Sequence, residues 1–156
     1  MEAKEKEKDM MAKMEMLENV IGQLYKIFSR QFDREDDFWM QLSKEEQNHA
    51  KLIKELGIEL KQGKFFLRAE RFKIEAVQTT IRYVQKRINQ VHHYRISEQE
   101  ACHIAWDIEN GLLEKNFFIT FETDQPALRK TLKKLIYDTR EHRNRIRERK
   151  QNHHVR

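Results

Sequence analysis

The sequence is poor in the residues that bend or cross-link a chain. It has one proline (Pro126), four glycines and one cysteine (Cys102) in 156 residues. Sheet proteins need many turn residues to connect their short strands, so this composition argues against an all-β fold. A single cysteine also excludes an internal disulfide bond and any CxxC metal or redox motif.

Long apolar runs are missing as well. The chain has no stretch of about 18 consecutive apolar residues, the length that a membrane-spanning helix requires. Its N-terminus is charged, whereas a signal peptide would be apolar there. We therefore expect a cytoplasmic protein without membrane contact. At 156 residues the chain suits one domain, spanning 1–156, with a single core.

Charge is unevenly distributed. Residues 129–156 hold eleven Lys and Arg against three acidic residues, a net charge of +8, so the total of +5 leaves −3 for residues 1–128. The basic C-terminus at 140–150, which runs into the tail at 147–156, has two interpretations: it contacts phosphates of nucleic acid or an acidic membrane, or it is an exposed helix extension beyond the bundle. Because aromatic residues are not interleaved there to stack on bases, we do not expect nucleic-acid binding.

Apolar residues recur at helical spacing along most of the chain. After a solvated, charged leader at 1–13, a first helix should end near residues 29–33 and a second should run from about 34–37 to Gly57 or Gly63. A further amphipathic helix is predicted over 71–93. Ser97, with Glu100 three residues later, is an N-cap signature for the next helix. The last helix should follow a cap in 123–125, with Pro126 in its first turn.

Charged and polar residues interrupt the apolar stripes of four of these helices. Such a residue on a core-facing position needs a partner or a metal ion. The interrupting residues are Glu18, Glu46, His49, Glu109, Thr139 and His142. One interpretation is an internal network of ion pairs in a plain bundle, for example Glu46 with His142. The other is a metal site.

Glu46 and His49 form a Glu-x-x-His pair, which presents a carboxylate and an imidazole on one helical face. Di-iron and di-manganese bundles use one Glu from each of two helices and one such pair from each of the other two. With the segments 18–25, 38–39, 45–50, 105–109 and 135–142, this pattern resembles the rubrerythrin branch of the ferritin-like superfamily, across nearly the whole chain.

The resemblance implies an all-α fold: a ferritin-like antiparallel four-helix bundle, with a long, partly helical crossover over 63–96 between its second and third helices. It implies metal ligation by Glu18, Glu46, His49, Glu109 and His142. The cofactor would be non-haem iron, one or two ions, with manganese or zinc as alternatives. The implied chemistry is oxidation of Fe(II) or reduction of peroxide, with peroxide or oxygen as small substrates. We also expect a homodimer.

Three departures from the family pattern bear on this function. Thr139 stands where the last helix should carry the Glu that pairs with His142, and Asp138 and Glu141 beside it lie off the stripe. Leu112 stands where a rubrerythrin would have an additional Glu. Without a CxxC module, electrons must come from an external donor. We therefore expect an altered site, and the alternative is a catalytically silent bundle that acts as an interaction or iron-binding protein.

Secondary candidates have plainer interpretations. Tyr25 is either a hydrogen-bond donor to the site or a core residue with its hydroxyl near water. We interpret Cys102 as a small buried hydrophobic residue. The pairs 92–93 and 153–154 are histidines near predicted helix ends, which we interpret as solvated.

Overall fold

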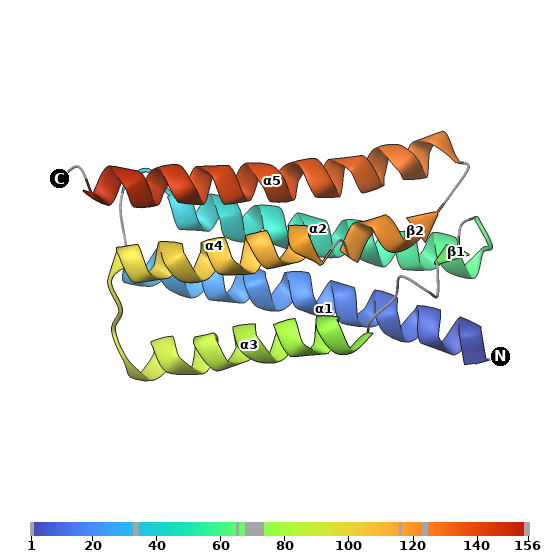
Figure 1. Ribbon diagram of the computed structural model, residues 1–156, viewed down its shortest axis with the longest axis horizontal. Coiled ribbons are helices and arrows are strands. Elements are labelled where there is room, and N and C mark those ends of the chain that lie inside the picture. Colours follow the sequence, from blue (N-terminus) through green and yellow to red (C-terminus); the bar gives the residue numbers. More distant parts are fainter. Residues whose placement is uncertain are drawn as a thin grey trace.

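In the computed structural model the chain forms an elongated helical bundle, and successive long helices run in opposite directions (Figure 1). The structure describes residues 2–32, 35–64, 66–67, 74–115, 117–122 and 125–154. The long helices in these ranges are α1 (Glu2–Gln31), α2 (Phe38–Lys61), α3 (Ile74–His93), α4 (Glu98–Glu114) and α5 (Pro126–His154). The expected all-α class is confirmed at this level.

The helices pack in pairs. α1 packs along α2, α4 packs along α5, and α2 also contacts α5, while α3 lies against α1 at one edge of the bundle (Figure 1). Buried apolar side chains from all five helices form one core. Its largest fully buried side chains include Trp39, Tyr25 and Phe28. No helix in the described ranges is both long and apolar enough to cross a bilayer.

Short elements close the end of the bundle where α2 ends and α5 begins. The two-residue strands β1 (Phe66–Leu67) and β2 (Phe121–Glu122) pair antiparallel, with Phe66 opposite Glu122. The 3₁₀ helix η2 (Phe117–Thr120) precedes β2. This ladder ties the chain after α2 to the chain before α5.

The predicted helix signals largely hold. Ser97 caps α4, because its Oγ accepts the N–H of Glu100 at 3.1 Å. Pro126 is the first residue of α5. Of the two glycines proposed to end α2, Gly63 does so: its φ is +74°, and the N–H groups of Gly63 and Lys64 close back onto the carbonyls of Leu60 and Glu59. The cap expected in 123–125 falls partly outside the described residues, which omit 123 and 124.

The expectation of a solvated leader at 1–13 is wrong for two positions, whereas the side chains at 5, 6, 8, 9 and 12 are exposed. α1 begins at Glu2, and Met10 and Met11 are buried in the core. With Met14 they continue the apolar stripe of α1 by more than one helical turn. Flexible methionine side chains fill such positions well, and so they extend the core where the charged residues around them suggested solvent.

Arg149 ties the C-terminal basic segment to the rest of the fold. α5 continues to His154, and the side chain of Arg149 is only 15% exposed. Its guanidinium pairs with Glu98 (Nε to Oε1, 3.1 Å) and with Asp36, and lies 4.8 Å from the centre of the Phe38 ring. Arg149 therefore ties the end of α5 to the start of α2 and of α4.

Candidate metal centre

The five predicted ligand residues meet in the bundle interior. Each is at most 2% exposed, although they come from four different helices. Glu18 lies on α1, Glu46 and His49 on α2, Glu109 on α4, and His142 on α5. The structure thus brings together all five carboxylate and imidazole side chains that interrupt the apolar stripes.

A close approach of α1 and α2 positions Glu46. Ser43 Oγ donates a hydrogen bond of 2.7 Å to the carbonyl oxygen of Gly22. A Cβ atom added at Gly22 would lie 3.5 Å from Glu46 Cβ and 3.4 Å from the Ser43 carbonyl oxygen. These are ordinary van der Waals distances, so α1 and α2 pack in direct contact beside Glu46.

Glu46 lies between the two imidazoles. His142 Nδ1 is 2.8 Å from Glu46 Oε1, and His49 Nδ1 is 3.6 Å from Glu46 Oε2. The two rings lie roughly parallel, with centroids 5.3 Å apart and an interplanar angle of 21°. One carboxylate thus faces both histidines.

The other two carboxylates flank this group. Glu18 Oε2 is 4.0 Å from His49 Nδ1, and Glu109 Oε1 is 3.6 Å from His142 Nδ1. Each imidazole therefore has Glu46 and one further carboxylate beside its Nδ1 atom. The arrangement has an approximate two-fold symmetry centred on Glu46.

Two acidic residues contact the outer nitrogens of the histidines. Asp138 Oδ2 lies 3.0 Å from His49 Nε2, and Glu45 Oε2 lies 3.6 Å from His142 Nε2. When His49 is neutral and donates its Nε2–H to Asp138, its Nδ1 lone pair faces the interior, as a metal ligand requires. Sequence reasoning missed both partners, although each directly precedes an inward-facing position: 45 before 46, and 138 before 139.

Thr139 is buried at 1% exposure, where the matching carboxylate was expected. Its hydroxyl donates a hydrogen bond of 2.8 Å to the Leu135 carbonyl of its own helix. Asp138, the acidic residue beside it, contacts the outer nitrogen of His49. Leu112, the other departure, is a buried core residue. The centre therefore has three inward carboxylates.

Tyr25 contacts the centre directly. Its hydroxyl donates a hydrogen bond of 2.8 Å to Glu109 Oε1, and its side chain is fully buried. Of the two sequence interpretations, the donor role is the one observed. The ring packs beside Trp39, with centroids 5.7 Å apart. Tyr25 thus supports Glu109 in the way that outer-shell donors orient metal ligands.

The centre holds an ion pair at its middle. Burial disfavours the charged form of Glu46, but hydrogen bonding to Glu18 and the charge on His142 outweigh burial and hold the pKa of Glu46 well below its usual value. Burial likewise opposes charge on His142, yet the Glu46 charge raises the pKa of His142 to about 11. In the metal-free protein Glu46 is ionised and His142 carries a proton.

The two flanking carboxyl groups, those of Glu18 and Glu109, have raised pKa values. Burial, together with the Glu46 charge, raises the pKa of Glu18 well above its usual value and that of Glu109 to about 7. Three carboxylates in one buried space cannot all be charged without a counterion. Protons balance the charge in the metal-free protein, and a bound cation would displace them.

The unpaired atoms of the centre fit a divalent cation. Four buried atoms that face the interior of the centre lack a hydrogen-bond partner among the described residues: Glu18 Oε2, Glu46 Oε2, Glu109 Oε2 and His49 Nδ1. Ligand atoms of Glu46, His49 and His142 also lie within 4.8 Å of one another. Carboxylate and imidazole donors suit iron, manganese and zinc.

Side chains outside this centre behave more simply. Cys102 is buried, and burial raises the pKa of its thiol to about 12, as expected for a core residue. His92 and His93 are exposed at the end of α3. The side chains of the histidines at 153 and 154 lie outside the described part of the chain.

No family model, curated protein or solved structure matches this chain.

Proposed function

We propose that this chain is a rubrerythrin-like member of the ferritin-like superfamily, with a buried metal centre in a four-helix bundle. In this proposal α1, α2, α4 and α5 form the bundle, and α3 belongs to the crossover between α2 and α4. The ligands are Glu18, Glu46, His49, Glu109 and His142. One observation carries the proposal: five ligand-type side chains from four helices meet in a buried interior, where Glu18, Glu46, Glu109 and His49 each have an atom without a hydrogen-bond partner.

The donor set favours unequal metal positions. Glu46, His49 and His142 supply three ligand atoms close together, with Glu18 beside His49. On the α5 side Thr139 contributes a neutral hydroxyl that is already bonded to its own helix. We expect one tightly held ion and a second, weaker position near Glu109. The missing charge disfavours two adjacent trivalent ions.

Iron is the proposed cofactor, and when bound it would supply the redox chemistry for oxidation of Fe(II) or reduction of peroxide. The hydrogen bond from Asp138 orients His49 so that its Nδ1 faces the interior, and Glu45 lies beside the outer nitrogen of His142. The Tyr25 hydroxyl donates a hydrogen bond to Glu109. Burial of the centre excludes bulk water, and electrons for turnover would come from an external donor because the sequence has no CxxC module.

Metal loading under anaerobic conditions tests this proposal. We expect one to two Fe(II) per chain by elemental analysis, and an optical change when oxygen or peroxide is added. Glu46→Ala should abolish metal retention, because it removes the carboxylate that faces both histidines. Glu141→Ala is the matched control on α5, since Glu141 lies off the inward face. Retention by Glu46→Ala, or no loading of the wild-type chain, would contradict the metal centre.

A second candidate function rests on the ion pair itself. The 2.8 Å contact between Glu46 and His142 is also what a catalytically silent bundle would use as an internal network. Such a protein would act through its surface as an interaction partner. In that case thermal unfolding should be unaffected by iron, zinc or manganese, and no metal should remain after gel filtration. A metal-dependent rise in Tm would exclude this candidate.

A further inference from the structure

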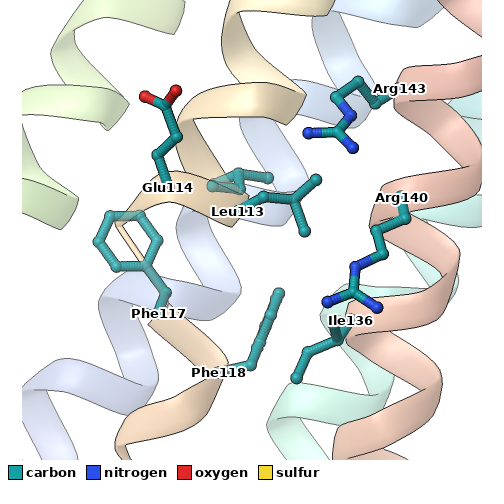
Figure 2. A pocket seen from close by; sticks show the side chains of 8 residues that line it. Leu113, Glu114, Phe117, Phe118, Ile136, Arg140 and Arg143 are labelled. Carbon is teal, nitrogen blue, oxygen red and sulfur yellow. The ribbon is translucent and has the colours of Figure 1, made fainter.

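A cleft between α4 and α5 lies beside the candidate metal centre and is separate from it. It encloses about 340 Å³, and Figure 2 shows the side chains around it. Its apolar lining consists of Leu112, Leu113, Phe117, Phe118 and Ile136. This volume lies at the lower end of the range of small-molecule pockets, roughly 300 to 1,000 Å³.

Two arginines from α5 provide the charge of the cleft. In Figure 2 the side chain of Arg143 extends from α5 toward Leu113 on α4, and the guanidinium of Arg140 lies beside Ile136. Arg143 Nη1 donates a hydrogen bond of 3.0 Å to Asn110 Oδ1, a neutral acceptor. Within the described part of the chain, neither guanidinium has a carboxylate at ion-pair distance.

Other arginines of the same helix differ in this respect. Arg145 pairs with Glu45, and Arg149 pairs with Glu98 and Asp36. The one acidic residue that lines the cleft, Glu114, accepts a hydrogen bond of 3.0 Å from Asn110 Nδ2, and in Figure 2 its carboxylate points away from Arg140. The guanidinium charge in the cleft is therefore left for a ligand.

We propose that the cleft between α4 and α5 binds an amphipathic monocarboxylate, with its carboxylate on Arg140 and Arg143 and its apolar body against Leu113, Phe118 and Ile136. Guanidinium groups match a carboxylate in charge and geometry. An inorganic anion would leave the apolar lining unused, and a neutral hydrocarbon would leave the arginines unused. The proposal is independent of the metal centre.

Octanoate is the probe for the test. Its binding to the full chain is measured by calorimetric titration, once after treatment of the protein with a chelator and once after loading with zinc. We expect affinity to rise from butanoate to octanoate, and octanoate to bind about tenfold more tightly than 1-octanol. Arg140→Gln and Arg143→Gln should each weaken octanoate binding about tenfold and leave 1-octanol unchanged. Arg147→Gln, an exposed arginine of α5 outside the cleft, should leave octanoate binding unchanged.

A cavity-filling variant tests the apolar half of the site. Ile136→Trp should abolish octanoate binding while the Tm of the protein stays near that of the wild type. The proposal is overturned if octanoate does not bind or if 1-octanol binds equally well. It is also overturned if the variant with both Arg140→Gln and Arg143→Gln binds octanoate normally. It is also overturned if inorganic phosphate displaces octanoate at equal concentration, because the cleft would then recognise charge alone.

Discussion

The stretches of α2 and α5 that face each other across the centre have nearly the same plan. In α2 the order is an outer acid (Glu45), an inward carboxylate (Glu46) and, three residues later, an inward imidazole (His49). In α5 the order is Asp138, Thr139 and His142. Each outer acid contacts the histidine of the other helix. The two stretches thus orient their imidazoles alike, and they differ in the charge of one inward residue.

The difference shows that the residues that contact the outer nitrogens of the imidazoles are not the residues that supply the inward negative charge of the centre. Both histidines have an acidic residue beside their outer nitrogen, although the inward position of α5 has only a hydroxyl. Glu46 consequently interacts with both imidazoles. Changes to the histidines, to Thr139, to the outer acids and to the pH test how the two stretches differ.

Removing either histidine should have the largest effect. His142→Gln should destabilise the metal-free protein by about 3–5 kcal/mol, because it leaves the buried Glu46 charge without its partner at 2.8 Å. His49→Gln should cost less, since its Nδ1 lies 3.6 Å from Glu46. Both variants should lose metal retention. Urea unfolding and elemental analysis measure the two effects, and equal destabilisation by both variants would contradict the proposed asymmetry.

Restoring the missing carboxylate is the second change. Thr139→Glu should raise the metal content by about one ion per chain, because it completes the second Glu-x-x-His pair. In the metal-free protein it should lower the Tm, since it adds another buried carboxylate. Thr139→Gln is the control with similar shape and no charge, and it should not raise the metal content. An unchanged content in Thr139→Glu would argue against a second position on the α5 side.

Weakening the outer acids should have an intermediate effect. Asp138→Asn should lower metal affinity about 10- to 100-fold, because Asp138 orients His49 at 3.0 Å. Glu45→Gln should lower it less, since Glu45 is 3.6 Å from His142, is 43% exposed and also pairs with Arg145. Competition with a chromophoric zinc chelator measures both affinities. A larger loss in Glu45→Gln would reverse this ranking.

Changing the pH should have the smallest effect over the range near neutrality. The pKa of Glu109 is about 7 and that of Glu18 is raised, so protons must leave before a metal binds, and affinity should rise from pH 6 to pH 8. The metal-free protein should show the opposite trend. Because the folded pKa of Glu109 lies above its unfolded value, the stability that it contributes is complete below about pH 4.5 and is lost as the pH rises through about 7. Metal titrations and urea unfolding across this range check both signs.

Much of the candidate site could be predicted because the helical period is regular. Glu18, Glu46, His49, Glu109 and His142 interrupt apolar stripes, and burial of those stripes brought all five side chains into the interior. The cap at Ser97 and the start at Pro126 depend on local backbone chemistry, so both could be predicted as well. The burial of Met10 and Met11 was not predicted, because the charged residues around them indicated a solvated segment.

The all-helical class and the inward-facing set of ligand-type residues follow from the sequence alone, since both depend on interactions within a few turns of one helix. Only the tertiary structure decided that Asp138 and Glu45 contact the opposite histidines, that Tyr25 donates to Glu109, and that Arg149 ties α5 to α2 and α4. These contacts join residues 51 to 113 positions apart. Their existence depends on how helices pack against each other, and helical periodicity holds no information on that.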